Sequence, residues 1–376
     1  MILLLEICVL VFYTLYSRYP YPQNMSNSVY TTLDILNVLI MDLVGFGFLM
    51  TFPRYYGYSA IMHSILCTVL CIQIYPLSQA FWRLETPIVI DTEMLLLALF
   101  CGASVLIAEG AILGKTTVAQ TVFFTTAFTI TYAANEYVGE LLHAQDVGGS
   151  TTIHTFGAFF GIFSGVFLLP TMQKDIIHSA SYESNIFSLL GTLVLFVFWP
   201  SFNSAYASPE LRTKAFMNTI LSLTGSTLST VYISIVLRGK LGITELQNAI
   251  LAGGVVMGTA GAMEIHPAVA IASGIIVGTV STIGFIRLAP ITGVYIHDTC
   301  GVLFLHGIPG LFGGVLGAIA AMYTEGLDAS QQMKYIGATL IISTCAGGFT
   351  GWLLYHCFTP ALREHFFNDL ENFKES

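Results

Sequence analysis

The chain has 376 residues, of which 55% are hydrophobic and only 9% charged, and its mean hydropathy is +0.76. Soluble domains carry about 25% charged residues, so this composition excludes an ordinary soluble protein and indicates a polytopic membrane protein. The apolar runs are continuous rather than alternating, which favours spanning helices over barrel strands. The net charge of −9 comes without a basic patch, so no nucleic-acid partner is expected.

In chain order, the sequence predicts an all-α fold of about twelve transmembrane helices joined by short links. The predicted spans are residues 1–16, 33–52, 59–79, 94–113, 116–138, 152–169, 185–203, 213–236, 246–265, 267–289, 300–323 and 334–357. Residues 1–32 are expected to form an N-terminal transmembrane helix and an extracellular loop, and residues 33–357 one membrane domain. Residues 358–376 are expected to form a short cytoplasmic tail with an amphipathic helix.

The distribution of lysine and arginine predicts the orientation of these spans. With both termini on the cytoplasmic side, eight of the 13 basic residues fall on the inner side and five on the outer side, which is the sense of the positive-inside rule. The sequon Asn24-Met25-Ser26 then lies in the first extracellular link, so Asn24 is a glycosylation candidate.

Two matched motifs lie at the starts of two apolar spans. Asp146 precedes His154 by eight residues, and Asp298 precedes His306 by the same spacing. In both copies glycine stands at the third place after the acid, and more glycines follow the histidine. Because exposed N–H groups and the helix dipole favour an acid at a helix start, both aspartates are expected at helix mouths.

The two motifs have opposite directions through the membrane. Without the first span, the next ten form a 5+5 set in which His154 lies on the fifth helix and His306 on the tenth. Eight residues place each histidine about 12 Å inside its own face, so the two should meet near the middle of a core roughly 30 Å thick. This geometry predicts an inverted repeat with a central site and an extra N-terminal helix.

Imidazole in such a place indicates function. Ionisable groups inside a membrane are expensive and commonly mark transport paths, and a pair of imidazoles resists holding two protons. The pair suits a small solute that enters as a cation and crosses as a neutral molecule. The alternative is a packed histidine bonded to a backbone carbonyl, which is less expected for two matched copies.

Five strings make the chain resemble the ammonium transporter/Rhesus glycoprotein family, and its Rhesus branch in particular. They run from the second span to the eleventh: residues 44–52 (VGFGFLMTF), 146–157 (DVGGSTTIHTFG), 199–205 (WPSFNSA), 247–254 (QNAILAGG) and 298–310, which holds DTCG and LHGIPG. The extra N-terminal span and the outer-loop sequon also resemble that branch.

The resemblance implies a homotrimer in the plasma membrane with one pore in each subunit. His154 and His306 match the twin pore histidines of the family. Phe202 matches one gating phenylalanine and Phe100 resembles the other. Asp146 resembles an acid near the outer end, and Glu136 resembles an acid of the outer vestibule, although a solvated loop charge is an equal interpretation of Glu136.

The chain also departs from the family pattern. Leu303 and Phe304 precede the second histidine where the family often has asparagine, and the expected inner acids are replaced at three positions (Asn185, Gly242 and Ile291). Asp42 and Glu109 are charges in spans where relatives look apolar. Glu109 is expected to reach the inner surface, and Asp42 to be a neutral acid or to pair with another helix.

The leading hypothesis is a pore in which ammonium loses its proton near Phe100 and Phe202, and ammonia then passes His154 and His306. Carbon dioxide stays open as a second solute. The alternative is a non-conducting structural subunit of a membrane complex. An enzyme is not expected, because no metalloprotease string and no nucleophile–base pairing occurs. The seven cysteines lack metal-ligand spacing, so no metal and no cofactor is predicted.

Overall fold

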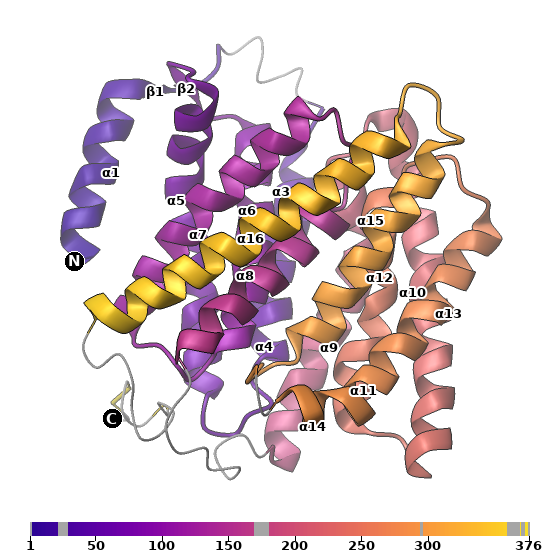
Figure 1. The fold of residues 1–376 in the computed structure, drawn as a ribbon. Coiled ribbons are helices and arrows are strands. Elements are labelled where there is room, and N and C mark those ends of the chain that lie inside the picture. The colour runs from indigo at the N-terminus through magenta and orange to yellow at the C-terminus, as the bar shows by residue number, and fades with distance from the viewer. Residues whose placement is uncertain are drawn as a thin grey trace.

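The computed structural model describes residues 2–21, 29–168, 180–293, 296–358, 369 and 373–374. They form a bundle of long helices that run between two faces (Figure 1), so the predicted all-α membrane fold is confirmed. The face that carries strands β1 (Ser17–Arg18) and β2 (Ile88–Val89) is called the outer face below, and the opposite one the inner face.

Some spans of the described chain are single long α-helices, and others are built from shorter α-helices joined by π-helical or 3-10 turns. The α-helices are α1 (Ile2–Tyr16), α3 (Thr32–Ile40), α4 (Gly47–Leu49), α5 (Gly57–Arg83), α6 (Thr92–Ile112), α7 (Val118–Leu141), α8 (Phe156–Gly165), α9 (Tyr182–Ala205), α10 (Pro209–Arg238), α11 (Ile243–Asn248), α12 (Ala252–Ala260), α13 (Pro267–Ile283), α14 (Ala289–Thr292), α15 (Ile308–Ala321) and α16 (Ala329–Cys357). The π-helical turns are Met41–Phe46, Ser150–Thr155, Gly284–Leu288 and Leu303–Gly307, and the 3-10 turns are Val166–Leu168 and Ala249–Leu251.

Within the described residues, nine helices are both long and apolar enough to span a membrane, compared with the twelve spans that the sequence predicts. Helix α1 has only 15 residues. The span predicted at 246–265 is divided by a 3-10 turn between α11 and α12. Helix α7 has 24 residues but is poor in strongly apolar side chains, and three of its polar side chains (Thr125, Thr129 and Glu136) contact α5.

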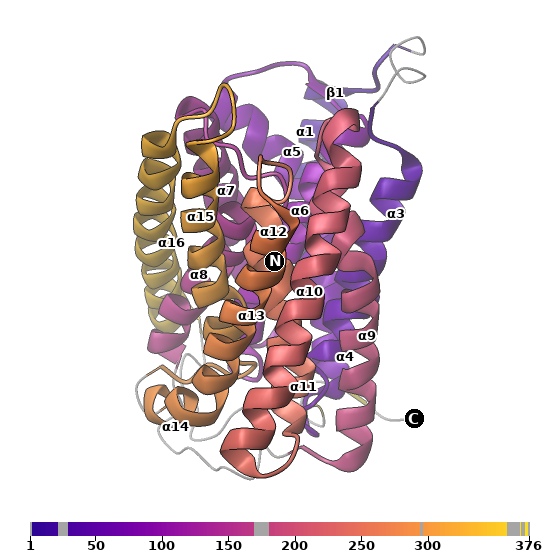
Figure 2. The same cartoon turned by 90° about the vertical axis from the view of Figure 1, so that its right-hand side faces the viewer.

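The bundle is tightly packed because small residues let backbones approach. A Cβ atom added to Gly161 would lie 2.6 Å from the Cα of Ala108, between α8 and α6, and one added to Gly274 would lie 2.8 Å from the carbonyl carbon of Ser222, between α13 and α10. Helices α10 and α13 run side by side in both ribbon views (Figures 1 and 2). Such contacts hold helices together where the hydrophobic effect contributes little.

The two predicted repeats pack against one another reciprocally. The turn that carries His154 packs against α15, and the turn that carries His306 packs against α8. Each histidine segment is therefore covered by the helix that continues the other one. Helix α1 stands apart at the edge of the bundle beside α5 (Figure 1), as an element added to a complete core.

Candidate functional site

The two histidines face one another in the interior. Nδ1 of His306 and Nδ1 of His154 are 3.2 Å apart, and the two rings are nearly parallel, with centroids separated by 5.2 Å and an interplanar angle of 20°. Both side chains are buried. In such a contact one nitrogen donates and the other accepts, so two imidazolium rings would set two N–H donors against each other. The geometry therefore disfavours a doubly charged pair.

The same local device positions both rings. Each histidine lies in a π-helical turn, Ser150–Thr155 or Leu303–Gly307. Each turn follows a glycine with positive φ, Gly149 at 72° and Gly301 at 74°. The αL conformation suits glycine because it has no Cβ. It lets the chain turn sharply into a buried helix, where the extra residue of the π-helix directs the imidazole toward the other repeat.

The two aspartates cap these turns, as the sequence analysis expects of helix-mouth acids. Oδ2 of Asp146 accepts from the N–H groups of Thr151 (3.0 Å) and Thr152 (2.6 Å) and from the Thr152 hydroxyl, and Oδ1 accepts from the Thr259 hydroxyl. Asp298 accepts from the backbone of residues 301, 302 and 303, at 2.9–3.0 Å. A carboxylate is the right group here because the first N–H groups of a helix have no partner within it.

Burial raises the pKa of both aspartates, while the hydrogen bonds they accept hold it down. For Asp146 the opposing donors are Thr259, Thr152 and Thr151. For Asp298 they are backbone N–H groups, assisted by the charge of Lys115. Burial in turn lowers the pKa of Lys115 to about 8, against the attraction of Asp298. Lys115 therefore acts on Asp298 through its charge, while its ammonium group donates to the backbone carbonyls of Ala111 (2.9 Å) and His297.

Aromatic rings enclose the histidine pair. Trp199 is fully buried and lies against both imidazoles, with centroid distances of 5.6 Å to His154 and 6.3 Å to His306. Phe202 lies 6.3 Å from His154 and 4.7 Å from Phe100, and both phenylalanines are buried. Phe100 and Phe202 therefore form a buried phenylalanine pair, called the plug below, on the outer side of the histidines.

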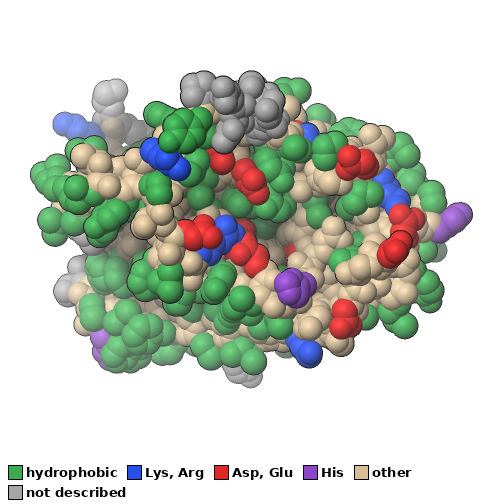
Figure 3. Space-filling view, turned by 90° about the horizontal axis from the view of Figure 1, so that it is seen from above, with side chains coloured by type: hydrophobic (Ala, Val, Ile, Leu, Met, Phe, Trp, Pro, Cys, Tyr) green, Lys and Arg blue, Asp and Glu red, His purple; other side chains and the backbone are tan. Residues whose placement is uncertain are grey.

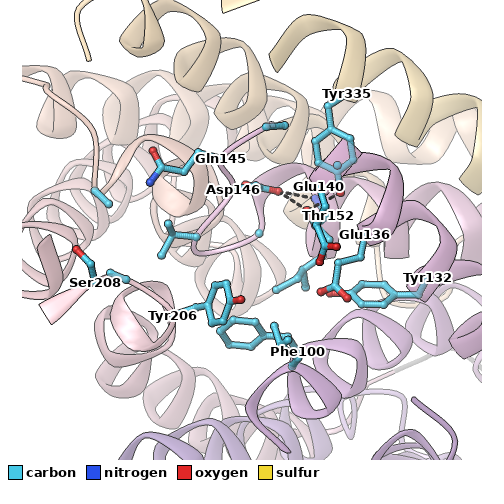
Figure 4. Close-up of a pocket in the computed structure, with 18 of the residues that line it drawn as sticks. Phe100, Tyr132, Glu136, Glu140, Gln145, Asp146, Thr152, Tyr206, Ser208 and Tyr335 are labelled. Atoms are coloured by element: carbon cyan, nitrogen blue, oxygen red, sulfur yellow. Dashed lines mark hydrogen bonds between the residues drawn. The ribbon is translucent and has the colours of Figure 1, made fainter. Parts of the chain in front are cut away.

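A cavity of about 270 Å³ opens outside this plug. Its lining combines acidic and aromatic side chains, and Figure 4 shows Glu136 and Glu140 on one side and Phe100 and Tyr206 on the other. Acidic side chains are also prominent around the middle of the outer face (Figure 3). Carboxylates and aromatic faces both attract small cations. The side chain of Glu136 thus lies in the vestibule wall and is not a freely solvated loop charge.

On the inner side of His306 a smaller cavity, of about 20 Å³, is lined almost entirely by apolar side chains such as Phe46, Leu305 and Val302. Phe304 is not among its lining residues. Its ring instead packs against Phe285, with a centroid distance of 5.8 Å. Of Leu303 and Phe304, which stand where the family often has asparagine, Phe304 therefore serves helix packing rather than the inner mouth.

The other singled-out residues have mixed outcomes. Asn24 and nearly all of the tail lie outside the described residues. Asn185 accepts a hydrogen bond from Gln247 (3.0 Å). The expectation that Glu109 reaches the inner surface is wrong: its side chain is fully buried and bonded to Nδ1 of His63 at 2.7 Å. The α5–α6 contact supplies an imidazole partner, which removes the need to extend toward water.

Sequence reasoning missed two residues of the site. Trp199 lies within the string that carries Phe202, and its proximity was the available signal. Tyr335 comes from α16, and its hydroxyl lies 2.8 Å from that of Thr152 and accepts from the Asn135 amide at 3.1 Å. Tyr335 thereby connects α16 and α7 to the aspartate-capped turn, a contact that no local pattern reveals.

An outer acidic vestibule, an aromatic plug and a buried imidazole pair in an inverted-repeat helical bundle define a polytopic membrane protein with a narrow polar site in its core. Residues 1–364 match the Ammonium Transporter Family. The chain belongs to this family.

Its relatives include Rh-type proteins. The chain is 42% identical to ammonium transporter Rh type C of Xenopus laevis, over 79% of this chain and 65% of the relative's length. It is 41% identical to ammonium transporter Rh type B of Sus scrofa, over 85% and 76%. The solved structure of Nitrosomonas europaea Rh50 superimposes with a TM-score of 0.81 at 35% identity, covering 89% of each chain. Saccharomyces cerevisiae Mep2 shares the fold, with a TM-score of 0.73 at 17% identity.

Proposed function

We propose that this protein conducts ammonia across a membrane, after ammonium has been recruited and deprotonated at the outer vestibule. The observation that carries the proposal is the buried His154–His306 contact of 3.2 Å between an aromatic plug and an apolar inner cavity. Similarity to Rh-type ammonium transporters supports the choice of solute.

In this mechanism the positive charge of ammonium stays outside the buried core. Ammonium can rest in the vestibule, where Glu136 and Glu140 offer carboxylates and Tyr132 and Tyr206 offer ring faces. Moving the cation into the interior would cost far more than moving the neutral molecule. We therefore place the loss of the proton at the Phe100–Phe202 plug. Ammonia then exchanges hydrogen bonds with imidazole nitrogens instead of water.

Several further features belong to the same proposal. The subunits assemble as homotrimers in the lipid bilayer of the plasma membrane, with both termini cytoplasmic and Asn24 as the glycosylation candidate. Carbon dioxide is a second candidate solute, because the inner cavity is lined by apolar side chains that do not discriminate against a small neutral molecule.

The test is stopped-flow alkalinisation of proteoliposomes after an ammonium jump. We expect the variant His154→Ala/His306→Ala to lose most of the ammonia permeability above that of protein-free vesicles, because the path then has no hydrogen-bonding groups at its centre. The control is His356→Ala, since His356 lies at the exposed end of α16. Undiminished permeability in the double variant would reject the role of the histidines.

The alternative is a non-conducting membrane subunit on the same fold, and the apolar inner lining next to His306 favours it. It predicts that wild-type vesicles take up ammonia no faster than protein-free vesicles. A carbon dioxide jump on the same vesicles distinguishes the two solutes. A path selective for ammonia would accelerate the alkalinisation that follows an ammonium jump, but not the acidification that follows a carbon dioxide jump.

A further inference from the structure

A cavity of about 530 Å³ lies between α1 and the helices α5 and α7, at the edge of the bundle, and is called the α1 groove below. All three helices contribute apolar side chains to its lining: Phe12, Tyr16, Ile74, Leu77 and Ile130. The groove shares no lining residue with the vestibule or with the inner cavity. It is therefore a separate feature from the histidine site.

Helix α1 is attached to α5 at the inner end of the groove. Pro76 lies inside α5, and because proline has no N–H, the carbonyl of Ile72 loses its usual helical donor. The Tyr13 hydroxyl lies 3.4 Å from that carbonyl oxygen and 3.1 Å from the carbonyl oxygen of Gln73. Tyr13 thus supplies a donor where the proline removes one, and this contact fixes α1 against α5.

A second attachment closes the outer end. Strands β1 and β2 pair in parallel, with Ser17 opposite Ile88 and Arg18 opposite Val89, and the N–H of Ile90 donates to the Arg18 carbonyl at 2.9 Å. Figure 1 shows both strands above the space between α1 and α5. A spanning helix of a partner protein would have to displace one of the two attachments, whereas a small molecule can enter the groove sideways from the bilayer.

The groove lies in the outer half of the membrane. Its lining on α5 extends from Ile74 to Phe81, which is about 10 Å at a rise of ~1.5 Å per residue, and half of a hydrocarbon core is roughly 15 Å thick. Trp82 follows Phe81, and Tyr16 lines the same end of the groove from α1. Tryptophan and tyrosine are enriched at the boundary between membrane and water, so the outer end of the groove lies near the lipid headgroups.

Apolar surface dominates the groove, and its polar side chains lie mainly at the outer end. The rings of Phe12 and Tyr16 are 6.0 Å apart on α1, and both remain exposed. The hydroxyl of Ser78 bonds to a carbonyl of its own helix at 3.0 Å. Glu85 and Thr86 come from the segment that follows α5. Among the described residues that line the groove there is no lysine or arginine.

We propose that the α1 groove binds a sterol, a lipid with a rigid fused-ring body and a single hydroxyl at one end. The ring body packs against Phe12 and Tyr16, and the hydroxyl donates to the carboxylate of Glu85 near the headgroups. Cavities of this size that combine an apolar lining with a few polar groups are typical of small-molecule sites. The site goes beyond the proposed function and does not depend on it, because the groove is separate from the pore.

The charge of the groove disfavours phospholipids. A phosphate would lie near Glu85, and no basic side chain of the lining would offset the repulsion. The arginines nearest in sequence have other contacts: Arg18 lies over the ring of Tyr21, and Arg83 pairs with Glu140 of the vestibule. A sterol hydroxyl is uncharged and gives the carboxylate a charge-assisted hydrogen bond. A rigid ring body also loses less conformational freedom on binding than an acyl chain does.

Photolabelling tests the site directly. The full chain is reconstituted in phosphatidylcholine vesicles with a trace of a cholesterol analogue that carries a photoreactive diazirine, and labelled peptides are identified by mass spectrometry. We expect label on the segments that border the groove, and we expect unlabelled cholesterol to displace it. The epimer with an inverted hydroxyl should compete less well, because its hydroxyl is turned away from Glu85.

Two variants probe the shape and the charge of the groove. Ile130→Trp fills the groove from α7, so labelling should fall roughly tenfold, the change in Kd that accompanies ~1.4 kcal/mol. Glu85→Gln keeps the shape but removes the charge. The affinity for the sterol should then fall roughly fivefold, because an ionised acceptor makes a stronger hydrogen bond than a neutral one.

The matched control is Leu10→Trp, which adds the same indole to an exposed position of α1 outside the lining, and its labelling should equal that of wild type. If Ile130→Trp is poorly folded, Tyr16→Ala replaces it, since Tyr16 is exposed on a helix at the edge of the bundle, and labelling should again fall. None of these measurements requires transport, so a failure of ammonia conduction leaves the test of the groove intact.

Several results would overturn the sterol site. Equal labelling of the groove in wild type and in the folded Ile130→Trp variant would reject it, and an affinity unchanged in Glu85→Gln would reject the contact with the hydroxyl. Displacement by phosphatidylserine as effective as that by cholesterol would assign the groove to phospholipid. Label that reaches the groove in detergent but not in vesicles would show that another protein surface covers it.

Discussion

Replacement of Gly149 by alanine should impair the site far more than the same replacement at another left-handed glycine. Gly149 has φ of 72°, and its carbonyl accepts from the backbone N–H of Ile153 and of His154, both at 2.9 Å. A disturbance at this residue is therefore transmitted directly to the π-helical turn that aims the imidazole.

The loss of stability expected for Gly149→Ala is the sum of two separate contributions. A left-handed conformation costs an alanine ~1–2 kcal/mol relative to glycine. A Cβ on Gly149 would also lie 2.8 Å from Cβ of Ile153 and closer still to its Cγ1 and Cδ1. Ile153 is buried and cannot swing away, and overpacking of this kind adds roughly 1–3 kcal/mol. At Gly239, φ is 76° but nothing lies within 4 Å of an added Cβ, so only the first cost applies.

The assay compares Gly149→Ala with Gly239→Ala by apparent melting temperature in detergent and by ammonia permeability in vesicles. Both variants should melt below wild type, with Gly149→Ala lower. Only Gly149→Ala should lose permeability, since it alone moves a histidine-bearing turn. If the two variants lose stability equally and keep equal permeability, the idea that the glycine turn positions His154 is refuted.

Three further predictions concern single contacts. Tyr335→Phe removes the hydroxyl that joins Thr152 and Asn135, so stability in detergent should fall by ~1 kcal/mol; a larger loss with altered secondary structure would instead indicate global misfolding. Trp199→Ala opens a cavity beside both imidazoles, so the free energy of unfolding should fall by ~3–5 kcal/mol. Ammonia permeability should fall as well, and normal permeability would contradict the supporting role of the indole. Lys115→Met should alter the pH dependence of stability. Since burial lowers the pKa of Lys115 to about 8, the unfolded chain holds this proton to higher pH than the folded chain. Stability should therefore rise with pH, by up to ~3 kcal/mol between about pH 8 and 10.5. Melting temperatures measured across that pH range should change less in the variant than in wild type. Identical profiles would contradict a lowered pKa of Lys115 in the folded protein.

Composition was sufficient to predict the all-helical membrane fold, because continuous apolar runs without charge have few other stable forms. The twin Asp–His spacing also predicted that His154 and His306 approach one another, since helix rise and opposite direction determine their depth. The aspartates could be placed at helix mouths for an equally local reason. Each of these features depends on composition, helix rise and helix direction, and none depends on how helices are rotated against one another.

Features that depend on how helices are rotated against one another were not predicted. The spacing of Cys67 and Cys71, one helical turn apart on α5, was readable in the sequence, but their partners on α7, Thr125 and Thr129, are 58 residues away along the chain. The same holds for Tyr335 and for the His63–Glu109 pair. The expectation that Glu109 extends to the inner surface was wrong because its depth was judged from its own helix, without the imidazole that α5 brings beside it.

The polar contacts between α5 and α7 also explain why α7 does not qualify as a spanning helix by hydropathy although it crosses the bundle. Three of its polar side chains are directed to α5: Thr125 contacts Cys67, Thr129 contacts Cys71, and Glu136 accepts from Tyr75. In a membrane a helix can carry so many polar side chains only if neighbouring helices satisfy them. A low hydropathy in a helix that is nevertheless packed inside the bundle therefore indicates a polar contact with a neighbouring helix, and in this chain that contact extends inward from Glu136 in the vestibule wall.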